Sequence, residues 1–109
     1  MLTFVLKKEW FDKIKSGEKT HEYREVNEYW GKRLNSFMYG PKPAGLPIQN
    51  TCVFLCGYPS KNDLSKRLYA NVKSIVVCDG IDTDLNIDSK VYDIEFELIK
   101  EWKNDKIQR

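Results

Sequence analysis

The sequence has little of what most protein metal sites require. It contains one histidine and three cysteines in 109 residues. Cys52 and Cys56 are four positions apart, but no second pair of ligands follows at the spacing of a zinc site. These two thiols and Cys78 all lie in or beside apolar runs, which is typical of buried, reduced cysteines in a cytoplasmic protein. We therefore expect no metal, no cofactor and a cytoplasmic location.

Long apolar runs and internal repeats are absent as well. No stretch approaches the roughly 20 apolar residues of a membrane-spanning helix, and the first residues do not resemble a signal peptide. The net charge is only +2. Residues 1–50 hold nine Lys and Arg against six Asp and Glu, whereas residues 51–109 hold nine against ten. This small basic excess near the start does not identify a nucleic-acid-binding protein on its own.

What remains is the composition of an ordinary globular domain. Hydrophobic residues make up 41% of the chain and charged residues 31%, which predicts a single domain over residues 1–109. Alternating and helical patterns predict strands at residues 2–6, 20–25, 36–39, 52–56, 72–78 and 92–100, and helices at 9–16, 27–34 and 61–68. Residues 40–50, with three prolines, read as a loop.

These elements predict an α+β fold with about six strands and two or three short helices. The strand at 52–56 is almost unbroken apolar sequence, and the strand at 72–78 has an apolar core at residues 75–77 that is expected to be buried. Strands that are covered on both faces favour a compact β-barrel over an open sheet.

The densest group of charged side chains lies at residues 17–24, directly after the predicted helix stop at Gly17. Alternation along the strand places Glu22 and Arg24 on one face, where they can pair, and Lys19 on the other. An exposed strand with screened charges is the simplest interpretation of this pattern. The alternative is a site in which Arg24 and Lys19 contact a phosphate or a base edge.

Other patterns carry weaker signals. Acidic and amide residues alternate from Asp82 to Asp88 as at the start of a calcium loop, but Ile87 replaces the turn glycine, so a solvated turn is predicted. His21 is expected to be an ordinary strand residue. Trp30, Tyr39 and Tyr58 are aromatics that either stack bases or fill the core.

The stretch from Trp10 to Arg24 resembles the signature of the ASCH domain family, W-x-x-x-I-x-S-G-x-K-x-x-E-x-R. The later Gly57-Tyr58 pair and the strands at 72–78 and 92–98 resemble further family elements. The resemblance implies a PUA-like fold, a small β-barrel with helices at its openings. It also implies RNA binding in a cleft that holds Lys19, Glu22 and Arg24. We expect Trp30 or Tyr58 to stack a base there.

One branch of that family consists of small amidohydrolases that act on acylated cytidine. Their catalytic lysine matches Lys19 and their arginine matches Arg24, but their threonine nucleophile falls at the position of Glu22. The leading hypothesis is therefore a module that binds RNA or a nucleoside or nucleotide ligand. The alternative is a small hydrolase of the N4-acylcytidine amidohydrolase type, or one acting on RNA, with Lys19 and Glu22 as catalytic residues. A protein-interaction domain is the third possibility.

Overall fold

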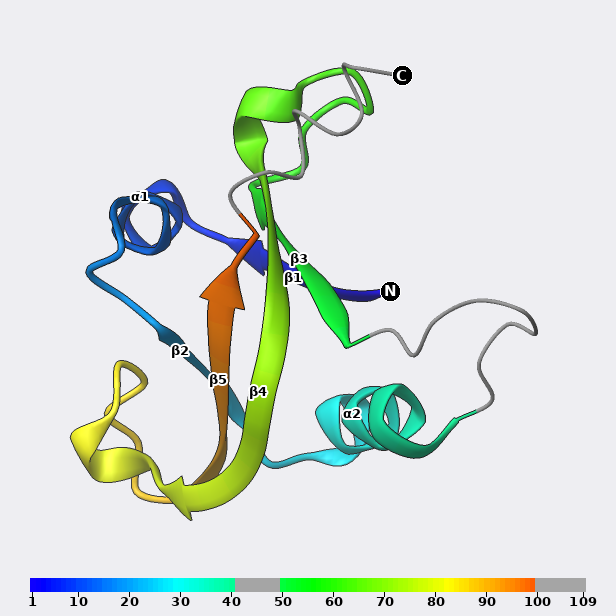
Figure 1. Ribbon diagram of the computed structural model, residues 1–109. Coiled ribbons are helices and arrows are strands. Elements are labelled where there is room, and N and C mark those ends of the chain that lie inside the picture. The colour runs from blue at the N-terminus through cyan, green and yellow to red at the C-terminus, as the bar shows by residue number, and fades with distance from the viewer. Residues whose placement is uncertain (41–49, 100–109) are drawn as a thin grey trace.

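The computed structural model describes residues 1–40 and 50–99. Within these residues the chain forms five β-strands and two α-helices (Figure 1). The strands are β1 (Leu2–Leu6), β2 (His21–Glu25), β3 (Thr51–Cys56), β4 (Arg67–Asp79) and β5 (Lys90–Leu98), and the helices are α1 (Lys8–Ser16) and α2 (Glu28–Tyr39). Two single-turn 3₁₀ helices, η1 (Leu64–Lys66) and η2 (Gly80–Asp82), flank β4.

All five strands belong to one mixed sheet in the order β1-β3-β4-β5-β2. The β1–β3 pair is parallel and the other three pairs are antiparallel. The sheet curves into a half-barrel, so its two edge strands, β1 and β2, approach each other across an open side (Figure 1). This is a barrel-like α+β fold, as the sequence predicted, with the barrel left open between β1 and β2.

A bulge in β4 lets one strand serve both halves of the sheet. Residues 67–71 of β4 pair with β3, and the register with β5 shifts between Val72 and Ser74. An extra residue at such a point bends a strand and increases its twist. The bend is visible in Figure 1, where β4 runs the height of the molecule and curves toward η2.

Each helix has one boundary where the sequence predicted a local signal, the end of α1 and the start of α2. Gly17 adopts the left-handed conformation, with φ of +88°, and its amide donates to the Ile14 carbonyl at the end of α1. At the start of α2, the Asn27 side chain accepts a hydrogen bond from the Trp30 amide at 2.9 Å. α1 packs against β3 through Phe11 and Ile14, and α2 packs against β1.

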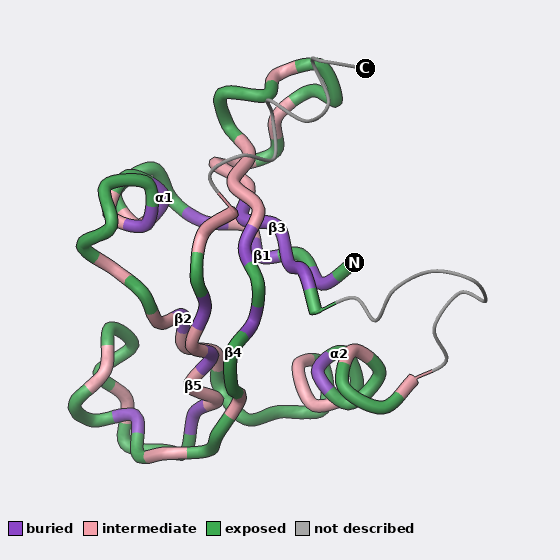
Figure 2. Tube along the Cα trace, in the orientation of Figure 1, coloured by how far each residue is buried: buried purple, intermediate pink, exposed green. Residues whose placement is uncertain are grey.

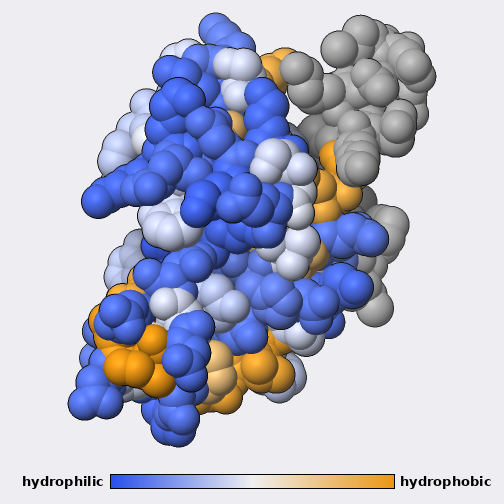
Figure 3. Space-filling view, turned by 90° about the vertical axis from the view of Figure 1, so that its left-hand side faces the viewer, coloured by the Kyte–Doolittle hydropathy of each residue, from blue (hydrophilic) through white to orange (hydrophobic). Residues whose placement is uncertain are grey.

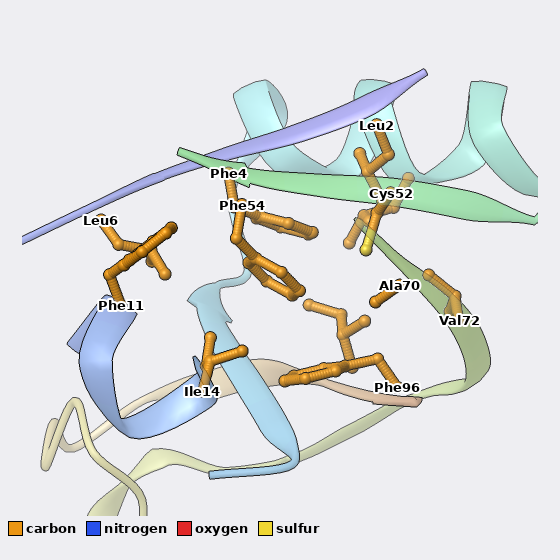
Figure 4. Close-up of a cluster of buried hydrophobic side chains, with 12 residues drawn as sticks. Leu2, Phe4, Leu6, Phe11, Ile14, Cys52, Phe54, Ala70, Val72 and Phe96 are labelled. Carbon is orange, nitrogen blue, oxygen red and sulfur yellow. The ribbon is translucent and has the colours of Figure 1, made fainter. Parts of the chain in front are cut away.

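The core fills the concave side of the half-barrel. Phe4 of β1 and Phe54 of β3 are fully buried and stack at 5.5 Å between ring centroids, and Phe96 of β5 contacts Phe54 at 4.7 Å (Figure 4). Side chains of α1 close one end of this cluster, and Ala70 and Val72 of β4 lie at the other (Figure 4). Buried positions concentrate in the middle of the sheet, whereas the outer turns are exposed (Figure 2).

Several predicted elements are confirmed with small shifts at their ends. The strands predicted at 2–6, 20–25, 52–56 and 92–100 correspond to β1, β2, β3 and β5, although residue 100 lies outside the described residues. The predicted loop at 40–50 also lies largely outside them. In β5, Ile94 and Phe96 point into the core while Glu97 is exposed, as the alternation predicted.

The prediction of a strand at 36–39 is wrong, and with it the count of six strands. These residues extend α2, which runs to Tyr39. Trp30, Leu34 and Phe37 follow one another at helical spacing, and all three contact the core. The packing of these three side chains against the core outweighs the β-propensity of the short aromatic segment.

Two predictions for the middle of the chain are also wrong. Residues 61–68 form only the single turn η1, because the Asp63 carboxylate accepts a hydrogen bond from the Ser65 hydroxyl and Arg67 already pairs with Leu55 of β3. Val76 and Val77 are about half exposed instead of buried. That part of β4 extends beyond β3 and pairs with β5 alone.

Candidate ligand pocket between the edge strands

A cavity of about 420 Å³ lies at the open side of the half-barrel, between β1 and β2. This volume falls within the usual range for small-molecule sites. The lining residues are Val5, Leu6 and Lys7 at the end of β1; Trp10 of α1; Lys19, Glu22, Tyr23, Arg24, Glu25 and Asn27; Trp30 of α2; and Asp84, Leu85 and Ile87, which follow η2. The pocket therefore collects residues from five separate parts of the chain.

Backbone groups of the two edge strands point toward this opening. The Leu6 carbonyl accepts a hydrogen bond from the Gly57 amide, so Leu6 faces β3 and its neighbour Val5 faces away from the sheet. On β2, the Thr20 carbonyl and the Val26 amide both bond to β5, so the even-numbered residues face β5 and Tyr23 faces outward. An edge of this kind offers backbone donors and acceptors to a ligand.

Glu22 is the most buried charged residue that the sequence singled out, with 5% of its surface exposed. Its Oε2 accepts hydrogen bonds from Arg24 Nε at 3.0 Å and Arg24 Nη2 at 2.6 Å. Its Oε1 lies 3.4 Å from Lys19 Nζ. A buried carboxylate is costly unless cations and donors compensate it, and both are present here.

Arg24 spans the opening of the half-barrel. Besides its bonds to Glu22, its Nη2 donates to the Val5 carbonyl of β1 at 3.4 Å. Its guanidinium carbon lies 5.2 Å from the ring centre of Phe4 and 4.9 Å from that of Trp30. These contacts fix the planar group between the two edge strands.

Lys19 reaches the pocket because it precedes β2 instead of belonging to it. The left-handed turn at Gly17 brings the Lys19 amide back to the Lys13 carbonyl, at 3.0 Å. The prediction that alternation separates Lys19 from Glu22 is therefore wrong, since β2 begins at His21. Only 9% of the Lys19 side chain is exposed.

The surroundings of the Lys19 ammonium are both aromatic and acidic. It lies 5.4 Å from the ring centre of Trp10 and 5.0 Å from that of Tyr23. It also forms an ion pair with Asp84, a residue 65 positions away in the sequence. Burial, followed by the charges of Asp93 and Asp84, raises the pKa of the Tyr23 hydroxyl above its ordinary value.

The two aromatics that were predicted to stack a base lie in different places. Trp30 lines the pocket, and its ring stacks on Phe4 at 5.3 Å. Tyr58 is 91% exposed in the turn after β3 and does not line the pocket. The structure thus brings Lys19, Glu22, Arg24 and Trp30 together and leaves Tyr58 apart.

Trp10 and Asp84 contact Lys19 in the pocket, and the sequence reasoning gave neither a role in the site. Trp10 is the tryptophan of the motif that pointed to the site, and it both packs against the core and lines the pocket. Asp84 was assigned to a solvated turn, and nothing in the sequence links it to Lys19. Ile81 and Leu85 are exposed in and after η2. Figure 3 shows hydrophobic surface gathered in the lower part of that face of the molecule.

His21 belongs to a separate pair. Its Nδ1 lies 2.6 Å from the Asp93 carboxylate on β5, and its ring stacks beside Tyr23. Within residues 1–40 and 50–99, no three His, Cys, Asp or Glu side chains gather closely enough to hold a metal ion.

Comparison with known proteins adds no relative from which to transfer a function. No protein-family model matches this chain, and no curated protein matches it. Over the same described residues, neither helix has the length and apolar character needed to cross a bilayer. The arrangement of the pocket is therefore the basis for the function proposed below.

Proposed function

We propose that this protein is an ASCH-like module that binds RNA or a nucleotide-like ligand in the pocket between β1 and β2. The observation that carries the proposal is the convergence of Lys19, Glu22 and Arg24 in one cavity, beside Trp10 and Trp30. Buried charged groups beside aromatic rings in a concave site are characteristic of binding and catalytic sites.

The chemistry of these side chains suits a nucleobase. Lys19 and Arg24 supply hydrogen-bond donors for base carbonyl or ring-nitrogen atoms, and Glu22 supplies an acceptor for an exocyclic amino group. The indole rings of Trp10 and Trp30 supply flat apolar surface, which every base can use. Outward-facing backbone at Val5 and Tyr23 adds further donors and acceptors at the strand edges.

The composition of the pocket lining favours binding over hydrolysis. Among the described residues around the pocket there is no Ser, Thr, Cys or His. Hydrolysis through a Ser, Thr or Cys nucleophile, as with the threonine of the resembling amidohydrolases, needs such a side chain within reach of the substrate. Glu22, at the position of the nucleophile in the resembling hydrolases, is instead engaged by both Arg24 and Lys19.

A binding titration tests the proposal. Fluorescently labelled single-stranded and structured RNAs are titrated with the wild-type protein and with Lys19→Ala and Arg24→Ala at two salt concentrations. Each substitution removes a charged donor, and we expect a loss of affinity of roughly tenfold or more. Arg24→Lys keeps the charge but loses the planar fork, so it is expected to bind nearly as weakly as Arg24→Ala.

Lys15→Ala is the matched control, because Lys15 is an exposed residue of α1 that does not line the pocket. It removes the same charge and should leave affinity within about twofold of wild type. Thermal melting of each variant separates loss of binding from loss of folding. Absence of RNA binding by the wild type, or equal binding by folded Lys19→Ala and Arg24→Ala, would contradict the proposal.

The hydrolase alternative is tested in parallel by incubating the protein with N4-acylated cytidines and with RNA, and separating the products by chromatography. We expect no turnover. Product formation that is abolished by Lys19→Ala would favour the enzyme.

A further inference from the structure

The charges that line the pocket cancel. Three cations, Lys7, Lys19 and Arg24, face three anions, Glu22, Glu25 and Asp84. A pocket that receives a phosphate group normally presents an excess of positive charge or free backbone amides. This balance indicates that the part of the ligand inside the pocket is uncharged.

Asp84 is the residue that removes the excess charge at Lys19. The Lys19 ammonium is nearly buried, and it is shared between Glu22 at 3.4 Å and Asp84. Glu22 already accepts two hydrogen bonds from Arg24. Asp84 is therefore the anion that pairs with Lys19. A phosphate that approached Lys19 would meet the carboxylate of Asp84 at the same nitrogen.

Arg24 is already paired with an anion, the carboxylate of Glu22. Its Nε and Nη2 are both committed to Glu22, and Nη2 also reaches the Val5 carbonyl. The pocket wall beside Asp84 is apolar, since Leu85 and Ile87 follow it in the chain and line the same cavity. Donors, aromatic rings and an apolar wall without net positive charge suit a heterocyclic base better than a phosphate.

We infer that Asp84 is a specificity-determining residue that admits the base of a nucleoside unit to the pocket and excludes phosphate. This inference rests on the proposed function and deepens it, because it states which part of an RNA or nucleotide enters the site. In RNA, the phosphates would remain outside the pocket while one base enters it.

The test compares the four ribonucleosides with their 5′-monophosphates, by calorimetry, on the wild type and on Asp84→Asn. For at least one base, the wild type should bind the nucleoside roughly tenfold more tightly than the monophosphate, because like charges brought together at a site disfavour binding. Asp84→Asn should raise the affinity for that monophosphate about tenfold and change the affinity for the nucleoside less than about threefold.

Asp88→Asn is the matched control. Asp88 lies in the same turn and is exposed, but it does not line the pocket, so this variant should keep the wild-type preference. Equal or tighter binding of monophosphates by the wild type would overturn the inference. An equal gain in affinity for nucleoside and monophosphate in Asp84→Asn would also overturn the inference, because Asp84 would then only obstruct the pocket.

The outcomes also separate this inference from the proposed function. RNA binding without binding of any nucleoside would overturn the role of Asp84 and leave the proposed function standing. Absence of binding to RNA, nucleosides and monophosphates alike would overturn both.

Discussion

Arg24 donates two hydrogen bonds to a single oxygen of Glu22, from Nε at 3.0 Å and from Nη2 at 2.6 Å. Because Nη2 also contacts the Val5 carbonyl, this pair of β2 residues reaches across to the other edge of the sheet. The pair therefore stabilises the open side of the half-barrel in addition to lining the proposed binding site.

Replacing Glu22 with glutamine should destabilise the fold. Glu22→Gln keeps the side-chain shape but leaves Arg24 without its buried anion and Lys19 with Asp84 alone, so we expect the free energy of unfolding to fall by roughly 3 kcal/mol. Urea denaturation measures the change. Glu18→Gln is the control, since its carboxylate is exposed beside Lys13 at 3.7 Å, and it should cost less than about 0.5 kcal/mol. Equal losses for the two variants would contradict this prediction.

Stability should fall when Gly17, which ends α1, is replaced by a residue that disfavours the left-handed backbone conformation. No atom lies within 4 Å of a β-carbon built at Gly17, so the cost of Gly17→Ala arises from its φ of +88° alone. We expect a loss of about 1–2 kcal/mol in the free energy of unfolding. Gly17→Asn should lose less, because asparagine tolerates this conformation. The two variants are compared by chemical denaturation, and equal stability of Gly17→Ala and wild type would refute the argument.

The cap of α2 should contribute measurably to stability. Asn27 accepts a hydrogen bond from the Trp30 amide, and Asn27→Ala leaves that amide without this partner. The expected cost is about 1 kcal/mol, and Asn27→Ser should recover most of it because serine is also a good N-cap. Thermal denaturation followed by circular dichroism gives both values. A serine variant as unstable as the alanine variant would show that the loss has another origin.

Cys52 should make stability fall in alkaline solution. Burial, with a further contribution from the charge of Glu22, raises the pKa of its thiol from 9.0 to about 12. The folded state then retains a proton that the unfolded chain releases, so this contribution is complete below about pH 9 and is lost as the pH rises toward 12.

The free energy of unfolding of the wild type should accordingly fall more steeply above about pH 9 than that of Cys52→Ala. Urea denaturation in the presence of a reducing agent, at several pH values on each side of 9, measures the two slopes. Parallel slopes would mean that this thiol does not control the pH dependence.

Local signals in the sequence determined most of the fold. The alternation of Leu2, Phe4 and Leu6 specified β1, and the αL requirement at Gly17 and the cap at Asn27 specified where helices end and begin. Each of these depends on residues within a few positions of one another, where sequence spacing translates directly into geometry. Where two local patterns competed, at residues 36–39, the helical stripe prevailed because Phe37 gains contacts with the core.

The sequence by itself also identified Lys19, Glu22 and Arg24 as candidate site residues, because they are close in the chain and fit one motif. Only the tertiary structure decided that they share a pocket with Trp30, that Tyr58 stays outside it, and that Asp84 pairs with Lys19. These relationships join residues far apart in the chain. They depend on how the half-barrel curves and on where the turn after η2 lies against its edge, and no local pattern encodes either.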